Sequence, residues 1–200
     1  MAGLIWAGAG LTTVAALGAL WAAVPRSPGE ASPEVSFARD MSAHHAQAVD
    51  MSVILFGRAA DPAVRLLAQD ILLTQQAQIG QMSGWLMAWN RPLAGLDAPM
   101  TGMNRSAMGL ASASAVAQLQ TLPVNTAQTR YLTLMRRHHQ GGVAMATSAL
   151  KTVKRPEVRS FARRVVSGQT AEIQAIDALL AGRMTDTAPA TPEMDGMPHE

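Results

Sequence analysis

The sequence contains an internal duplication. Residues 37–86 align without gaps to residues 131–180, and thirteen of the fifty aligned pairs are identical. Four of the five histidines in the chain lie inside this repeat, as two adjacent pairs at equivalent positions. A duplication limits the possible architectures more strongly than any local motif, because two similar units carry similar faces that must be buried. The sequence therefore predicts two copies of one structural unit, each with the same potential metal ligands.

The composition favours helices and excludes several kinds of site. Apolar residues make up 48% of the chain and aromatic residues only 4%, and alanine and methionine, which are strong helix formers, supply much of the apolar share. The net charge of +2 is too small to predict a nucleic-acid partner. Cysteine is absent, which excludes thiolate metal sites, disulfides and cysteine nucleophiles. A soft metal ligand would have to be one of the thirteen methionines.

The two ends of the chain differ from its middle. Residues 3–24 carry no charge, and a helix of that length spans the hydrocarbon core of a bilayer. We expect residues 1–24 to be an uncleaved membrane anchor, with a cleaved signal segment as the alternative, because no basic residue precedes the apolar run. Either reading places the protein outside the cytoplasm, in the periplasm or at the cell surface. Residues 25–35 have the prolines of a linker, and residues 183–200 have the composition of a disordered tail.

Proline and asparagine mark the ends of the helices within each repeat. Asp61-Pro62 is a cap followed by proline at the first helical position, and Arg155-Pro156 is its counterpart. Asn90-Arg91-Pro92 ends the second helix, and Gly182 is expected to cap the last one. These signals predict four long helices, at Val35–Arg58, Pro62–Trp89, Thr126–Thr152 and Pro156–Ala181.

Each repeat is thus a helical hairpin that cannot bury both of its apolar stripes alone. Two hairpins that face each other can do so, which predicts an all-α four-helix bundle over residues 36–182 with pseudo-two-fold symmetry. The connection over residues 91–125 is long enough to cross along the bundle, and it contains one short helical candidate, Ser106–Leu122.

The histidine pairs fall on the inward stripes of the first helix in each repeat. Residues three, four and seven apart share one face of a helix, and on that rule the two stripes are Met41, His44, His45, Ala48, Met51 and Met135, His138, His139, Gly142, Met145. Gly141 and Gly142 cost helix stability, which is commonly accepted where a backbone or a ligand approaches closely.

Polar residues on the second helix of each hairpin are predicted to lie at the level of the histidines. A turn centred near residue 60 places Gln75 opposite the first histidine pair, and the repeat places Gln169 opposite the second pair. A buried amide needs a hydrogen-bond partner, and a histidine ring is the expected one. By the same geometry Gln78 lies level with Met41, and Glu172 lies level with Met135.

These motifs resemble the domain-of-unknown-function 305 family. The resemblance rests on Met41-x-x-His44-His45 with Met51 and Gln75-x-x-Gln78-Ile79, on the equivalent residues Met135 to Ile173, and on the methionine-rich segment 99–103. It covers about residues 36–182 and implies a ferritin-like fold, export from the cytoplasm and a link to copper binding and tolerance. The first repeat departs from the family pattern, because Gln78 stands where a glutamate is expected.

The residue types favour copper over other metals. Imidazole with thioether suits copper, and methionine favours Cu(I), whereas a di-iron site needs inward carboxylates that this stripe lacks and zinc has no need of methionine. The predicted ligands are therefore His44, His45, His138, His139, Met41, Met51, Met135 and Met145, with Gln75, Gln169 and Glu172 orienting them. A copper carrier or buffer, bound to the membrane through its N-terminal segment, is the predicted function.

Two other functions remain open on the sequence. The same core could hold the metal or haem of an oxidoreductase, although no catalytic motif supports an enzyme. The histidines could also serve only to specify helix packing in a structural or interaction module. His199, Met194 and Met197 could catch metal, but they lie in the predicted tail. The sequence does not identify a protein partner.

Overall fold

The part of the chain that the structure describes is built from helices and connecting loops. The computed structural model describes residues 26–185, and within these residues it contains no strand. The helices are α2 (Pro33–Arg58), α3 (Pro62–Ala88), α4 (Ala113–Thr121), α5 (Val124–Thr152) and α6 (Pro156–Thr185). The all-α prediction is confirmed. The predicted anchor at residues 1–24 and most of the predicted tail lie outside the described residues, and no helix in the described part is both long and apolar enough to cross a membrane.

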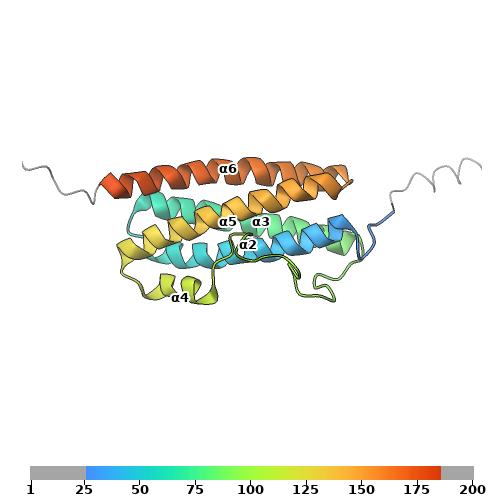
Figure 1. Ribbon diagram of the computed structural model, residues 1–200, viewed down its shortest axis with the longest axis horizontal. Coiled ribbons are helices and arrows are strands. Elements are labelled where there is room, and N and C mark those ends of the chain that lie inside the picture. The colour runs from blue at the N-terminus through green and yellow to red at the C-terminus, as the bar shows by residue number, and fades with distance from the viewer. Residues whose placement is uncertain (1–25, 186–200) are drawn as a thin grey trace, which may run out of the picture.

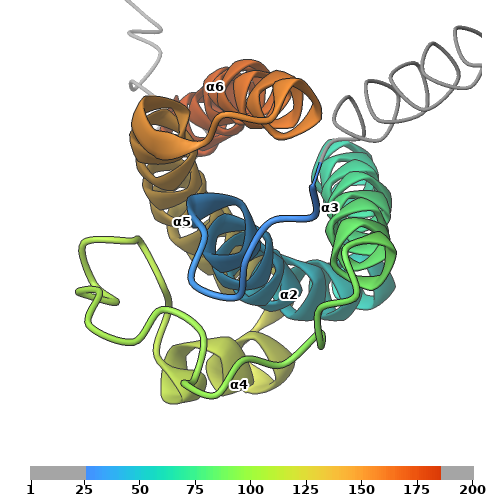
Figure 2. The ribbon, with the colours of Figure 1, turned by 90° about the vertical axis from the view of Figure 1, so that its right-hand side faces the viewer.

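Four long helices form the bundle as two hairpins. Helix α2 packs against α3, and α5 packs against α6. The hairpins meet through α2 and α5, which run antiparallel, while α4 packs on the outside of that pair (Figure 1). Helices α3 and α6 are the outer helices of the bundle, and α6 lies on the side opposite α4 (Figure 2). The histidine-bearing helices are therefore the two central ones.

The hairpin turns form where the sequence predicted them. The Asp61 carboxylate accepts the backbone N–H of Ala63 at 2.9 Å, as an N-cap does. Proline at the first helical position has no N–H to leave unpaired, which suits the starts of α2, α3 and α6. Helix α3 ends at Ala88, and Asn90 follows with a φ of 54°, a left-handed conformation that asparagine tolerates.

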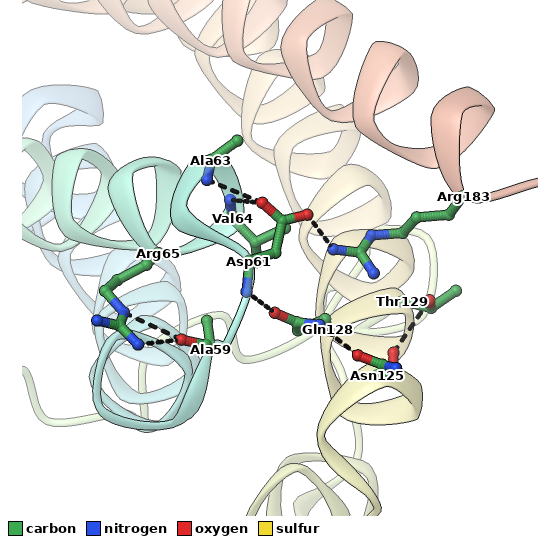
Figure 3. A network of polar contacts seen from close by, with 9 residues as sticks. All are labelled: Ala59, Asp61, Ala63, Val64, Arg65, Asn125, Gln128, Thr129 and Arg183. Atoms are coloured by element: carbon green, nitrogen blue, oxygen red, sulfur yellow. Dashed lines mark hydrogen bonds and ion pairs between the residues drawn. The ribbon is translucent and has the colours of Figure 1, made fainter. Parts of the chain in front are cut away.

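Each hairpin turn is also held by a side chain from the other hairpin. The Glu34 Oε1 atom accepts the backbone N–H of Lys154 at 2.7 Å, and the Gln128 Oε1 atom accepts that of Asp61 at 2.8 Å (Figure 3). Glu34 and Gln128 are equivalent residues of the duplication, because they are separated by the same offset as the repeats. The start of each central helix therefore secures the turn of the opposite repeat.

Two predicted helix boundaries differ from the structure by at least one helical turn. Helix α4 begins at Ala113 rather than Ser106, because Gly109 adopts a φ of 71° and Ser112 caps the helix through the N–H of Ala115. Helix α6 continues through Gly182 to Thr185 instead of ending there. A glycine costs a helix only about 1 kcal/mol, and Arg183 ties this last turn to Asp61 through an ion pair at 2.5 Å (Figure 3).

The apolar core is divided into two clusters along the bundle. One contains Phe37, Trp89 and Phe161, and the other contains Leu55, Ile71 and Tyr131. Histidines and glutamines are also buried, and they belong to neither apolar cluster. The bundle thus carries a layer of polar side chains within an otherwise apolar interior.

Candidate metal centre

All four histidines of the repeats are buried inside the bundle. His44, His45, His138 and His139 each have a relative exposure of 0%, as the helical periodicity predicted. They come from α2 and α5, the two central helices, and the duplication gives each histidine an equivalent residue on the other helix. The polar layer therefore contains two imidazole pairs in one part of the core.

The two first histidines of the pairs meet each other directly. The rings of His44 and His138 stack with their centroids 3.8 Å apart and their planes inclined by 30°. The Nε2–H of His138 donates to the backbone carbonyl oxygen of His44 at 2.9 Å. The Nε2–H of His44 donates to the carbonyl oxygen of Met108, in the crossover loop, at 3.0 Å.

The second histidine of each pair bonds to the neighbouring helix of its own hairpin. His45 Nε2 lies 2.6 Å from Gln78 Oε1 on α3, and His139 Nε2 lies 2.6 Å from Glu172 Oε2 on α6. The expected partners, Gln75 and Gln169, do not make these contacts. The prediction for these two glutamines is therefore wrong by one helical turn, whereas Glu172, which was also predicted to orient a ligand, does contact a ring.

These four contacts fix the tautomer of every ring. Carbonyl, carboxylate and amide oxygens accept hydrogen bonds, so each Nε2 carries a proton, and in a neutral ring this leaves the lone pair on Nδ1. All four Nδ1 atoms are buried and have no hydrogen-bond partner. Metal-bound histidines commonly have this arrangement, with one nitrogen donating to an oxygen and the other free to ligate.

Burial also keeps three of the rings neutral, those of His44, His45 and His138. It lowers the pKa of His44 to about 4 and that of His45 to about 3, with the neighbouring His44 adding to the shift. Burial lowers the pKa of His138 well below its ordinary value. Neutral imidazole is the form that binds a metal ion, so no proton has to leave these three rings at neutral pH.

The predicted glutamines lie beside this layer without hydrogen-bond partners. Gln75 and Gln169 are 1% and 4% exposed, and both amide atoms of each side chain lack a partner. They line a cavity of about 20 Å³ between α3 and α6, together with Gln78 and Glu172. A β-carbon added at Gly142 would lie 2.2 Å from the Gln169 Oε1 atom. Gly142 therefore provides the space that the Gln169 side chain fills, where the sequence predicted the approach of a backbone or a ligand.

The predicted methionines divide between the two apolar clusters. Met41 and Met145 belong to the cluster that contains Phe37, and Met51 and Met135 belong to the cluster that contains Tyr131. Each cluster therefore receives one methionine from each repeat. In the sequence, one methionine stands three residues before each histidine pair and another stands six residues after it.

The crossover loop contributes residues that the sequence analysis did not assign to the site. Met103 and Met108 of this loop line a cavity of about 380 Å³, together with Asp40 on α2 and Met145 on α5. The loop is held close to α5, because a β-carbon at Gly141 would lie 1.8 Å from the carbonyl oxygen of Met108. Gly141 thus allows the backbone approach that brings the Met108 carbonyl to His44.

The histidines and carboxylates of the described residues do not by themselves form a metal-binding cluster of three or more groups. A complete ligand set would have to include methionine sulfur or an amide oxygen. Each of the four Nδ1 atoms lacks a hydrogen-bond partner and is of a type that ligates metal ions. The methionines in the two adjoining apolar clusters are ligands that a soft metal prefers.

Comparison with known proteins identifies the family. The model of the family described as "Domain of unknown function (DUF305)" matches residues 34–180. The chain belongs to the DUF305 family. The predicted resemblance is thereby confirmed, and the match spans both hairpins together with the crossover. A search of curated proteins found no significant match.

Solved DUF305 structures share the fold of this protein. A DUF305 protein from Streptomyces coelicolor is 42% identical, with a TM-score of 0.72 over 76% of this chain and 94% of that one. A DUF305 fragment from Deinococcus radiodurans is 39% identical, with a TM-score of 0.69 over 79% and 99%. CopM in its Cu(I)-bound form is more distant, at 25% identity and a TM-score of 0.60 over 76% and 97%.

Proposed function

We propose that this DUF305 protein binds copper in the histidine layer and acts as a carrier or buffer outside the cytoplasm. The N-terminal apolar segment would hold it at the membrane. The proposal rests on one observation above all, which is that four buried imidazoles donate through Nε2 and leave four Nδ1 lone pairs without a partner. Copper would supply a cation that accepts these lone pairs.

The protein's own groups are arranged to receive such an ion. Each ring is held in a fixed orientation by one oxygen acceptor, which belongs to Gln78, Glu172, Met108 or His44. The rings therefore lose little rotational freedom when a metal ion binds. Burial keeps His44 and His45 neutral. Met41, Met51, Met135 and Met145 are the thioethers proposed to complete the coordination, which would favour Cu(I) over harder ions.

The similarity to CopM supports the same conclusion. CopM is described in a Cu(I)-bound form, and its structure aligns with 76% of this chain. The identity of 25% supports copper as the metal class and does not by itself assign the ligands.

A purely structural role explains less of the layer. Packing accounts for the four Nε2 contacts, but it leaves four ring nitrogens and the four amide atoms of Gln75 and Gln169 buried without partners. Native proteins satisfy the great majority of their buried polar atoms, and each exception calls for a bound ion, a water or a strain. Metal ions bound at these ring nitrogens would provide the partners that they lack.

Copper binding by the untagged full-length protein tests the proposal. We expect His44→Ala combined with His138→Ala to weaken Cu(I) affinity by at least about tenfold, measured by competition with a coloured Cu(I) chelator. The matched control is His199→Ala, which removes the one histidine outside the repeats and should leave affinity and stoichiometry unchanged. If the double variant binds copper like the wild type, the core is not the site.

A further inference from the structure

The two repeats differ in charge at one equivalent contact. His45 and His139 each meet an oxygen of the neighbouring helix at 2.6 Å. In the first repeat the oxygen belongs to the neutral amide of Gln78, and in the second it belongs to the carboxylate of Glu172. The equivalent positions and the distances are the same, and the two side chains have nearly the same size, so the difference is electrostatic rather than geometric.

The surroundings do not cancel this difference. Glu172 pairs with His139, and its side chain is only 16% exposed. Arg164 lines the same small cavity, but it donates to Ser160 and lies over the ring of Phe161. The charge of Glu172 is thus held in a partly buried position, where screening by solvent and salt is weak.

We propose that Glu172 makes the His139 half of the site the stronger one and biases it toward doubly charged ions, while Gln78 leaves the His45 half suited to singly charged soft ions. This rests on the proposed function. A carboxylate that accepts the Nε2–H of a ring increases the electron density at Nδ1, and its charge attracts the bound cation. A neutral amide orients the ring without adding charge. The duplicated site is therefore not symmetric in affinity.

The electrostatic part of this effect scales with the charge of the ion. Removing one negative charge at a fixed distance costs a divalent cation about twice the free energy that it costs a monovalent one. We expect Glu172→Gln to weaken Cu(II) binding by about tenfold to a hundredfold. Ag(I), a stable soft monovalent probe, should lose only about the square root of that factor. Gln78→Glu should strengthen binding with the same ordering.

An exchange of the two residues provides the sharpest test. In the full-length wild type, His139→Ala should weaken Cu(II) binding more than His45→Ala does. In the exchanged protein, Gln78→Glu combined with Glu172→Gln, the order of the two alanine effects should be inverted. A merely structural role of Glu172 does not produce that inversion, because both rings keep an oxygen partner in each background.

The outcomes separate the two proposals. If the wild type binds neither Cu(II) nor Ag(I), the proposed function fails and this inference fails with it. If the wild type binds metal but the order stays the same after the exchange, only the inference is overturned. Circular dichroism checks the fold of each variant. If an alanine variant does not fold, the test is the loss of affinity that Glu172→Gln alone causes for Cu(II) and for Ag(I). Equal fold-changes in affinity for the two ions overturn the inference.

Discussion

His44 and His138 stack on each other at the contact between α2 and α5, with ring centroids 3.8 Å apart. They are equivalent residues of the duplication, so each meets its own copy. An interface between two similar units brings equivalent residues together near its pseudo-two-fold axis, as it does in a symmetric dimer. The duplication therefore places the candidate metal site at the junction of the hairpins, where both halves contribute to it.

The metal-free protein should lose stability in mild acid. Burial lowers the pKa of His44 to about 4 and that of His45 to about 3, against 6.5 for an ordinary histidine. Between these values the unfolded chain binds more protons than the folded one. The stabilising contribution is therefore complete above pH 6.5 and is lost as the pH falls toward 4, by up to ~1.4 kcal/mol per pH unit for each ring.

Urea titrations at about pH 7.5, 6 and 5 measure this dependence through the unfolding midpoint. His44→Gln removes one buried imidazole and should make the dependence shallower, whereas His199→Ala should not change it. A midpoint that stays constant across this range would show that the buried rings do not govern acid stability.

Gly141→Ala should destabilise the protein although alanine is the better helix former. The added β-carbon would lie 1.8 Å from the carbonyl oxygen of Met108, and a backbone atom cannot move aside as a side-chain end can. We expect a net loss of about 1–3 kcal/mol in the free energy of unfolding. Gly80→Ala in α3 is the matched control, because nothing lies within 4 Å of its β-carbon, and it should stabilise by about 0.5–1 kcal/mol. Equal effects of the two changes would rule out the close loop contact.

Glu34→Ala and Gln128→Ala should each weaken the contact between the hairpins. Each removes an acceptor from a backbone N–H at the turn of the other repeat, and we expect a loss of about 1–3 kcal/mol in each case. Glu34→Gln keeps an acceptor oxygen and should cost less. Glu157→Ala serves as the control, since its carboxylate pairs with Arg155 at the surface, and it should change stability by no more than ~0.5 kcal/mol. Thermal unfolding of the four variants ranks them, and a ranking with Glu157→Ala among the most damaging would contradict the assignment.

Asp61→Ala should cost more than Arg183→Ala, although the two side chains form one ion pair (Figure 3). Asp61 also caps α3 through the N–H of Ala63, and loss of a cap costs about 1 kcal/mol. The ion pair is partly exposed and contributes only ~0–1 kcal/mol. Asp61→Asn, which keeps a capping oxygen, should resemble Arg183→Ala in a denaturant titration. The interpretation fails if the asparagine variant is as unstable as the alanine variant.

The helices and their inward faces were predictable because their signals are local. Asp61-Pro62 encodes the start of α3 within two residues, and the spacing of Met41, His44 and His45 selects one helix face. Because the repeat is duplicated, the equivalent residues predict the same helix start and the same inward face in the second copy. The boundary at Gly182 was not predictable in this way, since the contact between Arg183 and Asp61 joins residues that are far apart in sequence.

Gln75 and Gln169 were wrongly predicted as the partners of the rings because side chains lean along their helices. Each Cα–Cβ bond tilts toward the N-terminus of its own helix. In the antiparallel hairpin, His45 leans away from the turn while the α3 side chains lean toward it. The ring therefore meets Gln78, one helical turn farther from the hairpin turn than Gln75. Matching positions by distance from the turn alone does not include this displacement.

The sequence by itself determined that this chain forms two helical hairpins and buries two matching stripes of histidine and methionine, because helical periodicity and helix caps act over a few residues. Only the tertiary structure decided that His44 stacks on His138, that the Met108 carbonyl reaches His44, and that Gln78 and Glu172 hold the other two rings. Those contacts depend on the register between helices and on the path of the crossover loop. Both are settled by how the hairpins pack together rather than by any local run of residues.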